Sequence, residues 1–211
     1  MLNEKDIIST LMMVREQNLD LRTVTVGINL TDCVSDDLQV FKRKIFDKIT
    51  RHASCNRIER RYGIEVANKR ISISPIGVVG APFSSEQLVE VALTLDKAAM
   101  ELGVDFIGGF SALVEKGMSQ GDQALIEAIP EALTQTNRIC SSVNVASTRA
   151  GINMNAILKM GQIIKQAAEL TAADDGLAAA KLVVFANIPQ DVPFMAGAYL
   201  GIGEADAVVS V

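Results

Sequence analysis

The stretch DFIGGFS, residues 105–111, joins a short apolar run to a pair of glycines and a serine. Two further segments have the same character: CSSVN at residues 140–144, and residues 187–197, which begin with Asn-Ile-Pro and end with Phe-Met-Ala-Gly. Each follows a run of apolar or β-branched residues that is typical of a strand. In a parallel α/β sheet, the loops that follow the strands gather at one edge, where binding sites are built. The sequence therefore predicts a ligand site formed by these segments.

Strand and helix patterns alternate along most of the chain. Strands are expected at residues 22–30, 71–74, 104–107, within 138–145, at 181–186 and at 206–211. Helices are expected at 3–17, from 35–37 towards 62, and at 84–102, 119–133 and 153–170. Ser84 and Ser119 each begin a capping box, with Gln87 and Asp122 three residues further on. This order predicts a single α/β domain over residues 1–211, with parallel strands that alternate with helices.

The composition is that of a globular protein, with 49% hydrophobic and 21% charged residues in a chain of 211. No apolar run approaches the length of a membrane-spanning helix, and the first residues do not resemble a secretory signal. The three cysteines, at positions 33, 55 and 140, are too widely spaced for a disulfide framework. We therefore expect a cytoplasmic protein that makes no contact with a membrane.

The net charge of −5 conceals a basic segment from Lys42 to Arg70, which holds ten basic and three acidic residues. Such a segment can attract phosphates or nucleic acid. The alternative is the solvated face of a helix, because Phe41, Ile45 and Ile49 have the spacing of a buried stripe. The sequence favours the solvated face, and nucleic acid is not the expected partner.

The residues expected to line the site are small or polar groups at the strand ends, with large apolar side chains as walls. They are Asp105, Gly108, Gly109, Phe110, Ser141, Ser142, Asn144, Asn153, Asn187, Phe194 and Met195. The glycine pair either lets a ligand approach the backbone closely or forms a tight turn. Asn153 opens a helix whose free N–H groups can hold an anion, or it serves only as the N-cap.

Cys140 is the candidate catalytic nucleophile. A thiol in that role needs a pKa lowered by a nearby cation, which Arg138 or Arg149 can supply. The alternative is a small buried hydrophobic side chain, the commonest role of a free cysteine.

The sequence contains no motif typical of a zinc site or a nucleotide-binding site. The single histidine, His52, and the distant cysteines exclude a zinc cluster, and no phosphate-binding loop or dinucleotide fingerprint is present. A hard-cation site would have to use Asp32, Asp36 and Asp105, although such carboxylates usually cap helices or face water. The sequence leaves the cofactor unknown.

Seven strings carry a resemblance to a known family. They are NKRIS (68–72), FIGGFSALV (106–114), CSSVN (140–144), GINM (151–154), KLVVFAN (181–187), PFMAGA (193–198) and GEAD (203–206). Together they resemble the PFL family, an uncharacterised bacterial and archaeal family named for a fold likeness to pyruvate formate-lyase. The resemblance covers residues 20–211.

This resemblance implies half of a ten-stranded α/β barrel made of two five-stranded parallel halves, and an ACT-domain regulatory protein as partner. The true lyases use a Cys-Cys pair and a C-terminal glycine radical segment. In this chain Cys140 is followed by Ser141, and no such glycine segment is present, so we expect no glycyl radical chemistry. Family members continue beyond a position like Val211, so we expect a missing half or a partner subunit to cover the apolar strand at 206–211.

Three functions stay open. The favoured one is an enzyme-like protein with a small-molecule pocket at the strand ends. The second is a non-catalytic sensor that binds a metabolite and acts with the ACT-domain partner, and the third is anion or nucleic-acid binding through residues 42–70. A homo-oligomer is expected in each case, and the sequence does not name the ligand.

Overall fold

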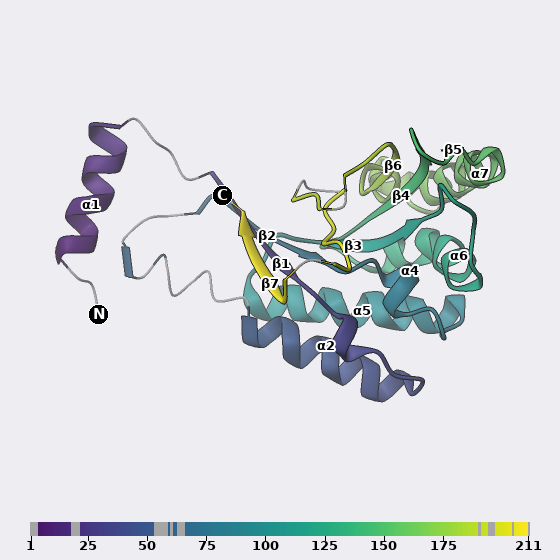
Figure 1. The fold of residues 1–211 in the computed structure, drawn as a ribbon, viewed down its shortest axis with the longest axis horizontal. Helices are drawn as coiled ribbons and strands as arrows, with labels where there is room; N and C mark the ends of the chain where they lie inside the picture. Colours follow the sequence, from purple (N-terminus) through teal and green to yellow (C-terminus); the bar gives the residue numbers. More distant parts are fainter. Residues whose placement is uncertain are drawn as a thin grey trace.

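The computed structural model describes residues 4–17, 22–52, 59, 61–62, 66–189, 191–193, 197–203 and 205–210. Strands and helices alternate in an α/β fold, as the sequence predicts (Figure 1). The strands are β1 (Thr23–Ile28), β2 (Asn68–Ile73), β3 (Phe106–Leu113), β4 (Ile139–Ser147), β5 (Gly151–Ile152), β6 (Leu182–Ala186) and β7 (Ala207–Ser210). The longer helices are α1 (Glu4–Arg15), α2 (Leu38–His52), α5 (Ser85–Leu102), α6 (Gln120–Gln135) and α7 (Met154–Leu170). Short turns are η1 (Thr31–Cys33), α4 (Ile76–Val79), η2 (Ala172–Asp174) and α8 (Leu177–Ala180).

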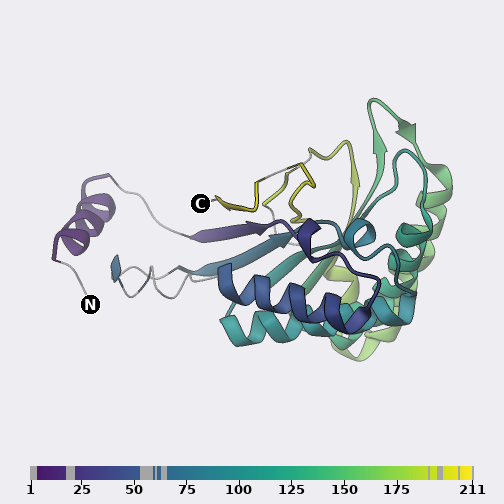
Figure 2. The same ribbon diagram turned by 60° about the horizontal axis from the view of Figure 1, so that its bottom comes forward.

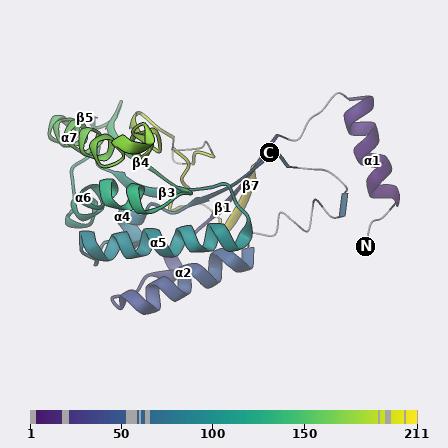
Figure 3. The ribbon, with the colours of Figure 1, turned by 180° about the vertical axis from the view of Figure 1, so that it is seen from behind.

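The described strands form one mixed, mostly parallel sheet of seven strands. Strands β1, β2, β3, β4 and β6 lie side by side in that order, and each pairs in parallel with the next. Because crossovers between parallel strands are right-handed, a sheet that grows in one direction places its connecting helices on one face. Figure 3 shows α2, α5, α6 and α7 side by side on that face.

Two strands run against this direction. β5 forms a hairpin with the end of β4, and β7 pairs with β1 in antiparallel, with Val209 opposite Val26. The prediction that all strands share one direction is therefore wrong for residues 206–211. Alternation of apolar and polar residues identifies a strand, but it carries no information on the direction in which the strand runs.

The helical face of the sheet holds the apolar core. Phe41, Ile45 and Ile49 of α2 are completely buried, as the predicted stripe requires. The capping boxes predicted at Ser84 and Ser119 are both formed, and they start α5 and α6. The core therefore follows from the helical periodicity of the sequence.

The opposite face of the sheet is lined by small and polar side chains. Thr25, Ser72, Ser111, Ser142 and Asn144 are buried there, because they alternate along their strands with the apolar residues that face the helices. Buried hydroxyl and amide groups need hydrogen-bond partners. The polar groups of this face therefore need hydrogen-bond partners from one another or from the segment that covers them.

The chain after β6 turns back across the polar face (Figure 2). We call residues 187–189, 191–193 and 197–203 the cover segment. Within it Val192 and Tyr199 pair in antiparallel, and the Leu200 N–H donates to the Ile73 carbonyl of β2 at 3.0 Å. A Cβ on Gly108 would overlap the carbonyl oxygen of Ala198. The small residues of the sheet thus let the cover segment lie close to the backbone.

The glycine pair lies within β3, not after it. The register between β3 and β4 shifts between Ile107 and Phe110, which marks a β-bulge. Gly109 has φ +112°, and a Cβ there would lie 2.5 Å from the Ile73 carbonyl oxygen. The tight-turn alternative is therefore wrong, and the protein's own cover segment makes the close approach at Gly108. CSSVN likewise lies inside β4, and not in a loop.

Helix α1 lies away from the sheet, and none of its residues is buried (Figure 1). It contacts residues 61–62, where Arg61 pairs with Asp6 at 3.0 Å and Thr10 donates to the Tyr62 carbonyl at 3.1 Å. Helix α2 ends at His52, and residues 53–58 of its expected extension lie outside the described chain. Among the helices described, none combines the length and apolar character needed to span a membrane.

Candidate functional site

The carboxyl ends of β1–β4 and β6 meet at one edge of the sheet, because these strands are parallel. Three predicted site residues lie at this edge: Asn144 near the end of β4, Asn153 at the start of α7 and Asn187 directly after β6. Leu113 of β3 and Phe185 of β6 flank Asn144 in register. Asparagines from separate parts of the sequence are therefore brought to the same edge.

Two of these asparagines already have hydrogen-bond partners within the chain. The Oδ1 of Asn153 accepts the N–H of Ala156 at 3.1 Å, and its Nδ2 donates to the Val114 carbonyl at 2.7 Å. The Oδ1 of Asn187 accepts both the N–H and the hydroxyl of Thr148. Asn153 is thus the N-cap of α7, and both side chains hold the loops at the strand ends in place.

Asn144 is different, because half of its amide is left without a partner. The residue is 5% exposed, and its Nδ2 donates to Oε2 of Glu115 at 3.1 Å. Its Oδ1 is buried and accepts no hydrogen bond from any described residue. An unpaired buried polar atom costs about 1–3 kcal/mol. The opposite amide orientation would set Oδ1 against the Glu115 carboxylate, so the contact with Glu115 fixes which atom is free.

The cover segment adds a buried phenol to this place. Tyr199 is 2% exposed, and its hydroxyl donates to the Pro189 carbonyl at 2.5 Å. Burial, followed by the negative charges of Glu115 and Asp191, raises the pKa of Tyr199 to about 12. Glu115 therefore contacts Asn144 and acts electrostatically on Tyr199 of the cover segment. We call Asn144, Glu115, Asp191 and Tyr199 the acceptor cluster.

Cys140, Ser141 and Ser142 lie deeper along β4. Cys140 is 2% exposed, and burial raises the pKa of its thiol to about 11 in spite of the nearby positive charges of Lys181 and Arg70. Ser141 donates to a backbone carbonyl at 2.6 Å, and Ser142 shares a hydrogen bond of 2.8 Å with the hydroxyl opposite it on β3. The thiol is thus protonated at neutral pH, while the two hydroxyls are already paired.

Other predicted site residues do not reach this edge. Asp105 precedes β3 at the amino edge, where its Oδ2 accepts the N–H of Lys69 at 2.8 Å. Phe110 is completely buried in the core beneath the helices, because β3 continues beyond the bulge and turns this ring towards them. Phe194 and Met195 lie outside the described residues.

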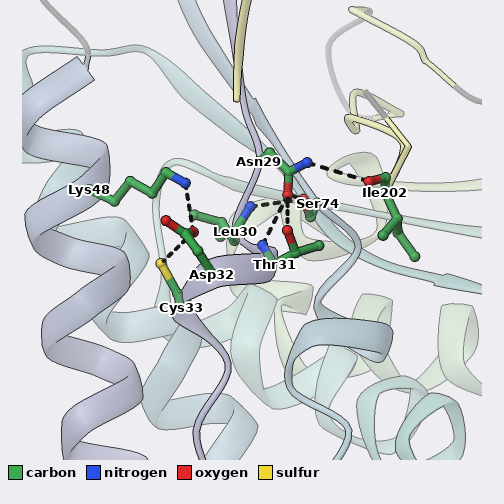
Figure 4. Close-up of polar contacts among 8 residues, drawn as sticks. All are labelled: Asn29, Leu30, Thr31, Asp32, Cys33, Lys48, Ser74 and Ile202. Atoms are coloured by element: carbon green, nitrogen blue, oxygen red, sulfur yellow. Dashed lines mark hydrogen bonds and ion pairs between the residues drawn. The ribbon is translucent and has the colours of Figure 1, made fainter. Parts of the chain in front are cut away.

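A second polar cluster, which the sequence interpretation missed, lies at the ends of β1 and β2 (Figure 4). The Oδ1 of Asn29 accepts the N–H and hydroxyl of Thr31 at 3.0 and 2.8 Å, and the hydroxyl of Ser74 at 3.3 Å. Its Nδ2 donates to the Ile202 carbonyl at 3.4 Å. Asn29 and Ser74 directly follow the last apolar residue of their strands, which is the signal that would have found them. These groups are all paired, so the cluster fastens the cover segment to the sheet.

Beside this cluster, Asp32 forms an ion pair of 2.6 Å with Lys48, and that contact holds the pKa of Asp32 below its usual value. Cys33 is buried, which raises the pKa of its thiol to about 11. A cavity of about 320 Å³ lies over these groups and is lined by Asp32, Cys33, Lys44, Asp47, Lys48 and Arg51. Its lining contains both positive and negative side chains.

Four of the ten basic side chains of the segment pair with carboxylates. Lys42 pairs with Glu90 at 2.8 Å, Lys69 with Glu59 at 2.7 Å, and Lys48 and Arg61 pair with aspartates. A surface cavity of about 540 Å³ between α2 and α5 mixes these charges with apolar groups; its lining is Gln39, Lys42, Arg43, Phe46, Glu90, Leu93, Thr94 and Lys97. This arrangement favours a solvated helix face over a nucleic-acid surface.

The carboxylates considered for a hard cation lie apart. Asp32 follows β1 at the carboxyl edge, whereas Asp105 lies at the amino edge. In the part of the chain that the structure describes, no three His, Cys, Asp or Glu side chains are placed to hold a metal ion.

Comparison with known proteins gives a family without an assigned activity. The family model described as "Uncharacterised ACR (DUF711)" matches residues 12–211. Similar proteins, each named UPF0210 protein, occur in Desulfovibrio desulfuricans (61% identical over 100% of the chain), Oleidesulfovibrio alaskensis (59% over 100%) and Methanosarcina acetivorans (54% over 99%). The matches cover 47%, 47% and 46% of those proteins. The chain thus spans about half the length of the curated relatives it matches.

Proposed function

Because the chain belongs to the DUF711 family, whose description names no reaction, we propose from its own residues that it binds a small polar metabolite at the carboxyl edge of the sheet. The ligand lies on the polar face, between the end of β4 and the cover segment. The acceptor cluster is the part of the site that the described residues provide.

The buried Oδ1 of Asn144 is the observation that carries this proposal. A polar atom that is buried without a partner costs stability, and such atoms are rare in folded proteins unless a ligand or water completes them. Its position at the carboxyl edge of a mostly parallel sheet is where α/β proteins bind ligands. A ligand that donates one hydrogen bond to Oδ1 would remove the cost.

Binding is better supported than covalent catalysis by this chain alone. The pKa of Cys140, raised to about 11, leaves very little thiolate at neutral pH. The serine hydroxyls of β4 already have partners. Turnover would have to come from groups that the ligand or the rest of the full-length protein contributes.

The resemblance to the PFL family supports a further part of the proposal. That resemblance implies two five-stranded parallel halves that close into a barrel, and this sheet has five parallel strands with their helices on one face. In a full-length protein, a second half pairing along β6 would enclose the polar face. A homo-oligomer, a cytoplasmic location and an ACT-domain partner stay predictions of the sequence.

The test is a screen of a metabolite library for thermal stabilisation of this chain. A ligand that binds only the folded state at 100 times its Kd adds about 2.7 kcal/mol of stability. We expect hits that Asn144→Ala abolishes and that Lys44→Ala, on the solvated face of α2, leaves unchanged. If Lys44→Ala abolishes stabilisation and Asn144→Ala does not, and only polyanions stabilise the chain, the basic face is the site and the proposal is wrong. A turnover assay of any hit then separates an enzyme from a sensor, and the Cys140→Ser variant shows whether the thiol takes part.

A further inference from the structure

Each side-chain donor group of the acceptor cluster already has a partner within the chain. The Nδ2 of Asn144 donates to Glu115, and the hydroxyl of Tyr199 donates to the Pro189 carbonyl. The neighbouring Nδ2 of Asn153 donates to the Val114 carbonyl. What is left unpaired is an acceptor, the Oδ1 of Asn144. A ligand at this place therefore has to bring the donors itself.

The charges at the same place are negative. Glu115 and Asp191 are both half-buried, and neither forms an ion pair with any described lysine or arginine. Both carboxylates act on the buried Tyr199, where they help to raise the pKa of the phenol. Two carboxylates that have no ion-pair partner among the described residues, acting on a buried phenol, produce a local potential that favours a cation.

We infer that the ligand carries a primary ammonium group, which donates to Oδ1 of Asn144 and to the carboxylate of Glu115. This inference rests on the proposed function, and it adds the chemical class of the ligand. An ammonium group has three donors and one positive charge, so it satisfies the free acceptor and neutralises the carboxylate at once. Asp191, which comes from the cover segment, adds to the attraction for the cation.

Other ligand classes fit less well. A carboxylate or phosphate would meet two negative charges, and each described side-chain donor group of the cluster already has a partner. A polyol would pair with Oδ1 but would leave the carboxylates without a counter-charge. A divalent metal takes six or more oxygen ligands or several charged side chains, and the described residues do not supply such a set.

The experiment compares ethanolamine with ethylene glycol, a pair that differs in one ammonium group. Both are added to isotopically labelled chain at pH 7.5, with the ionic strength equalised by sodium chloride. The readouts are the side-chain amide signal of Asn144 by NMR and the thermal midpoint. We expect ethanolamine to shift the Asn144 signal in a saturable way and to bind at least about tenfold more tightly than the diol.

Two variants test the charge. Glu115→Gln keeps the shape of the side chain and removes its charge, so ethanolamine should bind about tenfold more weakly while the weak diol is unaffected. Asp191→Asn should reduce ethanolamine binding in the same direction. Glu101→Gln, an exposed position on α5, is the matched control and should bind ethanolamine like the parent chain.

The outcomes separate this inference from the proposed function. If library ligands depend on Asn144 but are not cationic, and ethanolamine leaves its amide signal in place, the ammonium class is wrong and the site stands. If magnesium or calcium chloride shifts the signal and ethanolamine does not, the site takes a metal and the inference is overturned. If no compound depends on Asn144, both proposals fail.

Discussion

Cys140 lies on the covered face of the sheet, where 2% of the residue is exposed. With a pKa raised to about 11, roughly one thiol in a thousand is ionised at pH 8. The positive charges of Lys181 and Arg70 oppose the effect of burial without overcoming it. The sulfur therefore behaves as a small buried group, and the catalytic role predicted for it stays a prediction.

We expect iodoacetamide to alkylate Cys140 in the folded chain at least about 100-fold more slowly than in the unfolded chain at pH 8. The measurement is the mass of the tryptic peptide 139–149, in which Cys140 is the single cysteine. A sample unfolded in urea supplies the reference rate. Rapid alkylation of the native chain would contradict the burial of this thiol and would support Cys140 as a nucleophile.

At the candidate site, the sequence could predict the edge of the sheet but not the full set of residues. Asn144, Asn153 and Asn187 were found because polar residues near strand ends share an edge in parallel sheets. Glu115 was missed because the bulge at Gly109 hides the true end of β3. Tyr199 and Asp191 were missed because they reach the site only when the cover segment folds back, which is a tertiary event without a local sequence signal.

Among the elements, α6 offers a direct test of how the sequence starts a helix. The Ser119 hydroxyl accepts the N–H of Asp122 at 3.1 Å, and the Asp122 carboxylate accepts the N–H of Ser119 at 3.1 Å. Ser119→Ala should lower the free energy of unfolding by about 1 kcal/mol, whereas Ser119→Gly should cost only a few tenths. Urea denaturation followed by circular dichroism measures both. Equal stability of Ser119→Ala and the parent chain would show that the capping box contributes nothing.

The contact between β3 and the cover segment is tested by a pair of glycines. A Cβ on Gly108 would overlap the backbone of Ala198, whereas a Cβ on Gly161 of α7 would meet no atom within 4 Å. We expect Gly108→Ala to destabilise the fold by about 1–3 kcal/mol. Gly161→Ala should stabilise it by about 0.5–1 kcal/mol, because alanine loses less backbone freedom in a helix.

Urea denaturation followed by circular dichroism measures the stability of both glycine variants. A neutral Gly108→Ala would mean that the cover segment does not press on β3 in solution. A destabilising Gly161→Ala would mean that the outer face of α7 is not open at this position.

The order and type of the longer elements could be predicted because the helices have apolar stripes and because α5, α6 and α7 begin at capping residues. The extent of β3 could not be predicted, because a pair of glycines is typical both of a turn and of a β-bulge. The direction of β7 could not either, because pairing with β1 is chosen by the whole sheet. The seven-stranded sheet is therefore mixed, where a parallel one was predicted.

On the scale of the whole molecule, the sheet has two faces of opposite character. One face packs aliphatic side chains against four helices, and the other packs hydroxyl and amide groups under the cover segment. Burying polar groups is tolerable only where each finds a partner. The cover segment supplies several, including the Pro193 carbonyl for Thr25 and the Ile202 carbonyl for Asn29. Burial on the two faces also shields groups that ionise at high pH: Cys33 lies in the apolar core, and Cys140 lies under the cover segment.

Cys33, Cys140 and Tyr199 all have a pKa raised by burial, from 9.0 to about 11 for the two thiols and from 10.0 to about 12 for the phenol. Between pH 9 and 11 the unfolded chain loses thiol protons that the folded chain still holds. The folded state then binds more protons than the unfolded state, so the free energy of unfolding falls as pH rises. Each thiol contributes about 1.4 kcal/mol per pH unit in this window.

We expect the stability of the chain to change little from these groups below pH 9 and to fall steeply between pH 9 and 11. Cys140→Ala should remove the contribution of one thiol to this pH dependence. The free energies of unfolding of the parent chain and the variant should therefore converge by about 1.4 kcal/mol per pH unit between pH 9 and 11. Val183→Ala, a non-titrating change on the neighbouring strand β6, should lower stability equally at every pH. Urea denaturation from pH 8 to 11 gives the three curves. If the parent and Cys140→Ala curves stay parallel, the thiol ionises as readily in the folded chain as in the unfolded one, and the cover segment does not keep water from this face.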